Sequence, residues 1–158
     1  MSGTWARRMG VALVRSDRAT IEASPALWRA LADGIDRGGE PLVPPVPDDV
    51  EWYEVREAGT AAGVAIVQRD HPRAGEATLL AVATAREHRG RSTAMKALLA
   101  AERRLAEEGC APMLTRVPRT NGRGFYFMLR CGYTPLTGDR RPDDPGDVTW
   151  FARRGSIV

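Results

Sequence analysis

The residues from 76 to 108 constrain this 158-residue chain more than any other stretch. Apolar and small residues at 76–84 are typical of a buried strand, and a short basic loop that contains Gly90 follows them. Beyond the loop, apolar side chains recur at helical spacing, which predicts a helix that begins at Ser92 and Thr93. The segment therefore predicts a strand, a tight loop and a helix that begins directly at the loop.

The start of this helix predicts a binding site for an anion. The first turn of a helix leaves about four backbone N–H groups unpaired and carries the positive end of the helix dipole. Gly90 lets the backbone come close to a ligand, Ser92 and Thr93 offer hydroxyl groups, and Arg89 and Arg91 add positive charge. These features suit a phosphate or a diphosphate. A capped helix beside two solvated arginines is the alternative interpretation.

Two blocks of the sequence resemble the GNAT superfamily of N-acetyltransferases. Residues 82–94 are similar to the acyl-CoA loop of that family, whose signature is Gln/Arg-x-x-Gly-x-Gly/Ala, and the chain has EHRGRS at 87–92. Gly90 matches the first glycine, whereas Glu87 and Ser92 depart from the signature. Residues 121–133 are similar to a second block of the family, Asn-x-x-Ala-x-x-Phe-Tyr-x-x-x-Gly-Phe. The two blocks occur in the order that the family has.

The resemblance implies an α/β fold of the α+β kind in a single GNAT-like domain over residues 1–158. This fold has a mixed, mostly antiparallel sheet of six to seven strands with helices on both faces. From the residues themselves, strands are predicted at 9–15, 51–56, 62–68, 76–84, 112–117, 133–136 and 148–153. In the resembled fold the fourth and fifth strands are splayed, and the gap between them is the acyl-CoA cleft.

The resemblance also implies acetyl-CoA, or another acyl-CoA, as co-substrate, and no metal. The backbone of Val82 and Thr84 would pair with the pantetheine arm, and an N–H near Val82 or Ala83 would polarise the thioester carbonyl. Asn121 would orient a pantetheine amide, cap its helix, or do both. The implied cofactor-binding residues are Val82, Ala83, Thr84, Arg89, Gly90, Arg91, Ser92, Thr93, Ala94 and Asn121.

The implied reaction is direct attack of an amine on the acyl group. A lysine-like amine titrates near 10.4 and attacks in its neutral form, so a base or a chain of waters must remove a proton. Glu76, on the fourth predicted strand, is the first candidate for the catalytic base. His71 and Glu54 are further candidates, and each of the three could equally be a surface residue.

The group that would protonate the leaving thiolate is less obvious. Counted back from Gly132, the tyrosine that often serves as the acid in this family falls on Met128, which has no proton to give. Tyr126 is the candidate catalytic acid in its place. It lies two residues earlier, however, and two residues along a helix correspond to about 200° of rotation.

Composition bears on three further properties: membrane insertion, nucleic-acid binding and the state of the cysteines. No run approaches the roughly 20 apolar residues that a membrane helix needs, which predicts a cytoplasmic protein that does not insert into membranes. The formal charge is +3, but basic residues are interleaved with acidic ones along the chain. This pattern favours a general compositional bias toward arginine, and not binding to nucleic acid, as the reason for the positive charge. Cys110 and Cys131 lack the spacing of a zinc site or a disulfide framework and are expected to be free thiols.

Three functions are therefore compatible with the sequence. The first is an acyl-CoA-dependent N-acetyltransferase, a monomer or homodimer, that acts on a small amine or a protein amino group. The second is a nucleic-acid base-modifying enzyme on a GNAT-like scaffold, as in the phage Mom-type proteins. The third is a non-catalytic acyl-CoA-binding regulatory module. The acceptor would be selected by the variable loops at 38–50 and 137–147, whose residues do not identify it.

Overall fold

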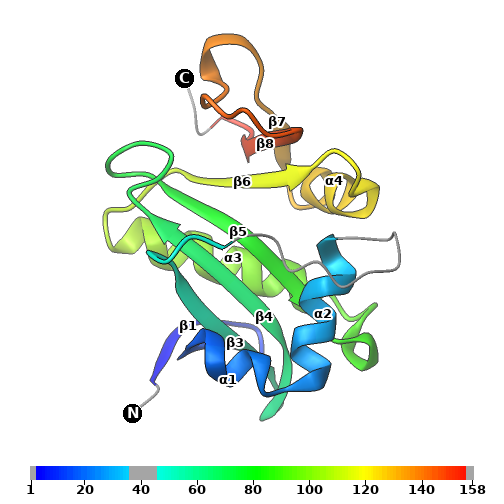
Figure 1. Ribbon diagram of the computed structural model, residues 1–158. Coiled ribbons are helices and arrows are strands. Elements are labelled where there is room, and N and C mark those ends of the chain that lie inside the picture. The colour runs from blue at the N-terminus through cyan, green and yellow to red at the C-terminus, as the bar shows by residue number, and fades with distance from the viewer. Residues whose placement is uncertain (1–2, 36–45, 156–158) are drawn as a thin grey trace.

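The structure, a computed structural model, describes residues 3–35 and 46–155. Within these residues the chain forms one eight-stranded sheet in the order β1-β2-β3-β4-β5-β6-β8-β7 (Figure 1). The strands are β1 (Thr4–Arg8), β2 (Val11–Ser16), β3 (Glu51–Glu57), β4 (Thr60–Arg69), β5 (Ala77–Thr84), β6 (Met113–Pro118), β7 (Tyr133–Pro135) and β8 (Val148–Arg153). All neighbouring pairs are antiparallel except β5 and β6, which are parallel. The predicted mixed, mostly antiparallel sheet is confirmed.

Helices cover both faces of the sheet, as predicted. The helices are α1 (Arg18–Glu22), α2 (Pro25–Ile35), α3 (Thr93–Glu107) and α4 (Gly122–Arg130), with short 3₁₀ turns at Arg86–His88 and Gly138–Arg140. Side chains of α1 and α2 pack on one face, and side chains of α3 and α4 pack on the other (Figure 1). Among the described residues, no helix is long and apolar enough to span a membrane.

The central helix α3 is held by an apolar face. Its alanines and leucines at helical spacing are buried against β1, β2 and β5, namely Ala97, Leu98, Ala100, Ala101 and Leu105. The helix ends at Glu107 because Gly109 has a φ of +77° and the N–H of Cys110 reaches back to the carbonyl of Leu105 at 2.8 Å. Both cysteines are buried free thiols.

The N-terminal segment differs from the prediction and adds a strand. The sequence suggested a first strand from Met9, but Met9 and Gly10 have φ values of +46° and +85° and form the turn of a β1–β2 hairpin. Only Ala6 is buried in β1, so the strand has almost no hydrophobic alternation by which to recognise it. The sheet consequently has eight strands in place of the expected six to seven.

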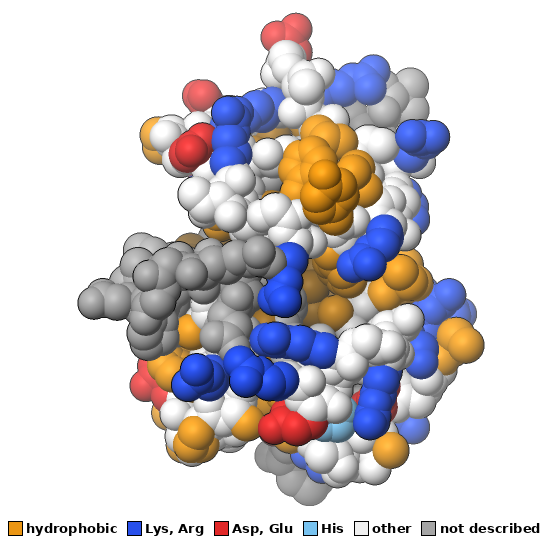
Figure 2. Space-filling model, turned by 90° about the vertical axis from the view of Figure 1, so that its right-hand side faces the viewer, with side chains coloured by type: hydrophobic (Ala, Val, Ile, Leu, Met, Phe, Trp, Pro, Cys, Tyr) orange, Lys and Arg blue, Asp and Glu red, His pale blue; other side chains and the backbone are white. Residues whose placement is uncertain are grey.

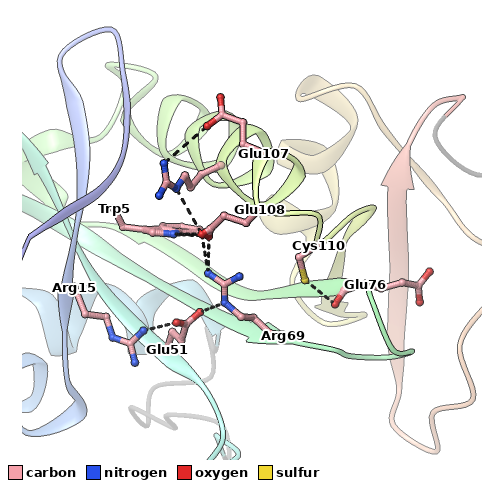
Figure 3. A network of polar contacts seen from close by, with 9 residues as sticks. Trp5, Arg15, Glu51, Arg69, Glu76, Glu107, Glu108 and Cys110 are labelled. Atoms are coloured by element: carbon pink, nitrogen blue, oxygen red, sulfur yellow. Dashed lines mark hydrogen bonds and ion pairs between the residues drawn. The ribbon is translucent and has the colours of Figure 1, made fainter.

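A polar network fastens this added strand to the far end of α3 (Figure 3). The Trp5 ring stacks on Tyr53 with centroids 4.5 Å apart, and its Nε1 donates to Glu108 Oε1 at 3.0 Å. Arg69 joins the same carboxylate, at 2.9 Å, to Glu51 on β3, at 2.6 Å. The network fixes the C-terminal end of a helix whose N-terminal end lies at the candidate site.

Candidate active site

Strands β5 and β6 separate after three residue pairs. They pair in parallel only from Ala77 with Met113 to Leu79 with Thr115. At the same point the register with β4 shifts, since Ile66 faces Ala81 and Val67 faces Leu79, which leaves Leu80 as a bulge. The edge of β5 from Leu80 to Thr84 is therefore unpaired on its β6 side, and an unpaired strand edge can bind an extended ligand.

Three cavities meet along this unpaired edge. The central one, of about 80 Å³, is bounded by the two strands and α4, and it shares Leu80 and Ala81 with an inner cavity of about 640 Å³. It shares Val82 and Ala83 with an outer cavity of about 460 Å³, which opens at the start of α3. Among the described residues the three cavities thus lie next to one another along β5, and we refer to them together as the channel.

The outer cavity begins at the basic loop that the sequence singled out. Gly90 and Ser92 have φ values of +82° and +61°, and no side chain caps the first turn of α3, whose first helical hydrogen bond runs from the Lys96 N–H to the Ser92 carbonyl. The backbone N–H groups of Thr93, Ala94 and the next residue are therefore not used within the helix. Alternating left-handed residues before a helix start form a concave anion site.

Basic side chains surround this outer cavity. Arg89, Arg123 and Arg130 line it, and the Nε of Arg89 donates to the Thr84 carbonyl at 3.3 Å. Figure 2 shows a hollow on this side of the molecule with Lys and Arg side chains above and below it. Arg91 is exposed on the loop but does not line the cavity. The charge of the outer cavity suits a diphosphate-containing ligand.

The Thr93 hydroxyl does not face this cavity. It is buried and donates to Glu57 Oε2 at 2.9 Å, and His88 Nδ1 lies 3.5 Å from the other oxygen of that carboxylate. The hydrogen bond from Thr93, aided by His88, lowers the pKa of Glu57. The Thr93 side chain thus ties the start of α3 to β3. The sequence suggested that its hydroxyl would contact the anion, but only its backbone N–H is left for a ligand.

Asn121 caps α4 as predicted and also reaches the channel. Its Oδ1 accepts from the Gly124 N–H at 2.9 Å, and the residue lines both the central and the outer cavity. A Cβ on Gly124 would lie 2.7 Å from Asn121 Nδ2 and 3.0 Å from Val117 Cγ1. A glycine at this position lets the capped end of α4 lie close to β6.

Met128 and Tyr126 lie in different environments. Met128 is buried, lines the central cavity and accepts a hydrogen bond from Thr115 Oγ1 at 2.9 Å. Tyr126 is 68% exposed and lines the outer cavity beside Arg123 and Arg130. The hydroxyl-bearing residue is thus at the mouth of the channel, and the thioether is in its narrow part.

The inner cavity has an aromatic and proline-rich wall with a partly buried ion pair. Trp150 of β8 lines it, and Asp144 accepts from Trp150 Nε1 at 3.0 Å, from Arg116 Nε at 2.6 Å and from the Gly146 N–H at 2.8 Å. The hydrogen bond from Arg116 is the main cause that lowers the pKa of Asp144 to about 2. The variable loop that the sequence predicts at 137–147 therefore carries a largely buried carboxylate that shapes this wall.

Glu76, the first candidate for a base, lies beside this wall and does not line any of the three cavities. Its side chain is 15% exposed, and Oε1 is buried, 3.6 Å from Arg73 Nη1, with no hydrogen-bond donor among the described residues. In Figure 3 the carboxylate points away from the Arg69 network. Glu54, a further candidate, pairs with Arg56 on β3. His71 does line the inner cavity.

Part of the predicted acceptor side lies outside the described residues. The predicted loop at 38–50 lies mostly within the undescribed residues 36–45, and of its remaining residues Val46 and Pro47 line the inner cavity. The second predicted loop contributes residues 142–145 to the same cavity. Among the residues that the structure describes, no group of three His, Cys, Asp or Glu side chains is placed to hold a metal ion.

Some residues that shape the site were not found from the sequence. A Cβ on Gly63 would lie 2.1 Å from the carbonyl oxygen of Ala83, so this glycine sets the spacing between β4 and the ligand-facing part of β5. A glycine inside a strand pattern is a signal for such a close approach. The pairing of Arg116 with Asp144 has no comparable local signal, because 27 residues separate them in the chain.

Comparison with known families identifies one match that covers most of the channel. A family model described as the acetyltransferase (GNAT) family matches residues 25–133. A search of curated proteins finds no significant match to the sequence.

Several solved structures share the fold at low sequence identity. A probable acetyltransferase of the GNAT family from Chromobacterium violaceum is 17% identical, with a TM-score of 0.69 over 95% of this chain and 86% of that one. An acetyltransferase from Thermus thermophilus is 18% identical, with a TM-score of 0.63 over 92% and 97%. The PaiA N-acetyltransferase from Thermoplasma acidophilum, solved in complex with coenzyme A, is 21% identical, with a TM-score of 0.53 over 66% of this chain and 60% of that one.

Proposed function

Because this chain belongs to the GNAT acetyltransferase family, we propose that it transfers an acetyl group from acetyl-CoA to the nitrogen of an amine acceptor. The observation that carries this proposal is the channel between β5 and β6, which joins a basic outer cavity to a separate inner cavity. A donor and an acceptor that enter from opposite ends would meet at Leu80 and Ala81, the residues that the central and inner cavities share.

The outer part of the channel fits the elongated shape and charge of CoA. We assign the diphosphate to Arg89, to the loop at Gly90 and Ser92 and to the backbone N–H groups of Thr93 and Ala94, where positive charge and left-handed backbone coincide. The pantetheine arm would run along the unpaired edge of β5 at Val82, Ala83 and Thr84 and would pass Asn121. This arrangement uses the residues that the sequence nominated for the cofactor apart from Arg91, which does not line the outer cavity.

The narrow centre would hold the thioester. A backbone N–H near Val82 or Ala83 would stabilise the negative charge that develops on the carbonyl oxygen during attack, as oxyanion donors do in acyl transfer. Met128 lines this part of the channel and offers no proton to the leaving thiolate. Tyr126 lies at the outer mouth, so solvent in the channel is the nearer source of that proton in this arrangement.

The inner cavity favours a small-molecule amine as the acceptor. Its volume of about 640 Å³ lies in the range of ordinary small-molecule sites, about 300–1,000 Å³. Trp150, five prolines and aliphatic side chains provide apolar contact, and Gln68, Arg116 and Asp144 provide polar groups. A protein amino group on a thin, extended segment is the alternative acceptor of the same chemistry.

The direct test is thiol release. Purified protein is mixed with acetyl-CoA and a panel of primary amines, including aryl-alkyl amines, aminoglycosides, amino acids and peptides, and free CoA thiol is measured with the acetylated product identified by mass spectrometry. We expect thiol release that depends on both substrates for at least one small amine. Tight acetyl-CoA binding with no release for any amine would contradict the enzyme and favour a non-catalytic binding module.

A further inference from the structure

The geometry of the inner cavity points to His71 as the group that takes the proton from the amine, with Thr78 fixing the ring in the form that can do so. This inference rests on the proposed acetyl transfer and assigns the base of that reaction. His71 lies in the turn between β4 and β5 and lines the inner cavity together with Leu80 and Ala81, the residues at which β5 leaves β6.

The hydrogen bonds around Thr78 determine which ring nitrogen of His71 carries the proton. Thr78 Oγ1 donates to the backbone carbonyl of His71 at 2.8 Å, and it lies 3.0 Å from His71 Nδ1. A threonine hydroxyl has a single proton, so an oxygen that donates to the carbonyl must accept from Nδ1. The neutral ring is therefore protonated on Nδ1, and its lone pair is on Nε2.

The same contacts hold the ring in place. Thr78 has no exposed surface, and the N–H of His71 donates to the Glu76 carbonyl at 3.3 Å, which closes the turn. On its other side the ring lies 6.0 Å from the Trp150 ring, centroid to centroid, at an interplanar angle of 36°. Nε2 has no hydrogen-bond partner among the described residues, so it is available to a substrate or a water in the cavity.

Apart from Asp143, the other charged groups near His71 are paired or lie outside the cavity. From its own turn, Arg73 is paired with Glu76, whose carboxylate does not line the cavity. From β6 and the loop 141–147, Arg116 and Asp144 are paired with each other, and Asp144 also accepts from Trp150. Gln68, from β4, donates to Asp49 at 3.2 Å. Asp143 lines the cavity from an exposed position.

The proton transfer is balanced without any further reactant. Nε2 accepts one proton from the ammonium form of the acceptor, directly or through one water, and the freed lone pair attacks the thioester carbon. The new C–N bond forms, the C–S bond breaks and the CoA thiolate leaves. The product nitrogen loses its second proton to the thiolate through solvent, and the imidazolium returns its proton to water.

The first test is the pH dependence of His71→Asn, whose side-chain amide can still donate to Thr78 but has no group in place of Nε2. We expect kcat/KM to fall about 100-fold near neutral pH, with the Kd for acetyl-CoA unchanged. The loss should shrink as the pH approaches the pKa of the acceptor amine, about 10.4 for an alkylamine, because a neutral amine needs no base. A loss of equal size at every pH would assign only a structural role and overturn the inference.

Matched variants separate His71 from its neighbours. Glu76→Gln and Asp143→Asn should keep the pH profile of the parent, and a profile abolished by either would move the base to that carboxylate. Thr78 is a positioning residue, so Thr78→Val should lower kcat and shift the acidic limb of the profile without changing the acetyl-CoA Kd. Thr78→Ser, which keeps the hydroxyl, should retain the kcat and the acidic limb of the parent protein.

A spectroscopic readout keeps the inference falsifiable even if the proposed acetyl transfer fails. The ¹⁵N chemical shifts of the His71 ring report directly which nitrogen is protonated in the neutral form. We expect the Nδ1–H tautomer in the parent protein and a mixture of tautomers in Thr78→Val. A ring protonated on Nε2 in the parent would overturn the inference whatever the enzyme does, whereas a correct tautomer without acetylation of any amine would refute the proposed function alone.

Discussion

Leu79 of β5 and Thr115 of β6 form the last residue pair at which these two parallel strands remain in register. The bulge at Leu80 follows at once, and from there to Thr84 the backbone of β5 is unpaired on that side. The separation turns an ordinary sheet into one with a channel through it. The basic loop at the start of α3 and the ion-paired wall beside Trp150 stand at its two ends.

Replacing Gly63 tests how closely β4 must approach β5. Gly63→Ala places a Cβ 2.1 Å from the carbonyl oxygen of Ala83, which must move because backbone cannot rotate aside. We expect the free energy of unfolding to fall by about 1–3 kcal/mol and acetyl-CoA affinity to fall with it. Urea denaturation and calorimetry measure the two effects. Gly3→Ala, which has nothing within 4 Å and no left-handed backbone, is the control for a glycine outside the site.

The position of Tyr126 at the outer cavity allows two roles, contact of its ring with CoA and acid catalysis by its hydroxyl, and substitutions can separate them. Because the ring is 68% exposed beside Arg123 and Arg130, we expect it to contact the nucleotide part of CoA by its face and not by its hydroxyl. Tyr126→Phe should keep kcat and KM within about twofold, and Tyr126→Ala should raise KM for acetyl-CoA about tenfold. Steady-state kinetics measure both. A loss of about 100-fold in kcat for Tyr126→Phe would instead make the hydroxyl the catalytic acid.

Asp144 gives the inner wall a stability that depends on pH. Because the pKa of Asp144 is lowered to about 2 from its ordinary value of 3.8, the ionised carboxylate stabilises the fold fully above about pH 4 and progressively less as the pH falls toward 2. Asp144→Asn should lower the free energy of unfolding by about 2 kcal/mol at pH 7. The difference from the parent should be smaller at pH 3 in urea titrations. A difference that is constant over this range would mean that the charge on Asp144 does not matter.

An exposed acidic residue of the same loop is the control for this effect. Asp139 lies in the 3₁₀ turn that precedes Asp144 and is exposed. Asp139→Asn should leave the urea midpoint within experimental error at both pH values, since a solvated charge contributes little.

The parts of the site that depend on local sequence could be predicted, and those that depend on distant contacts could not. The loop at Gly90, the helix that follows it and the Asn121 cap use short-range rules of helix ends and left-handed residues. The hydrogen bonds of His71 with Thr78 and of Arg116 with Asp144 form only after the β4–β5 turn and the loop 141–147 have folded back, so no periodicity reports them. The β1 strand escaped prediction because it buries a single alanine.

The most direct test of the account is the binding of acetyl-CoA to the protein and to Gly90→Glu, measured by calorimetry. Gly90 lies open with a φ of +82°, as does Gly10 with +85°, so Gly10→Glu carries the same backbone strain and the same charge away from the channel. The account predicts micromolar binding to the parent and to Gly10→Glu, and a loss of about 100-fold or more in Gly90→Glu, where a carboxylate opposes the diphosphate. No binding to the parent, or equal binding to both variants, would contradict the placement of acetyl-CoA in this channel.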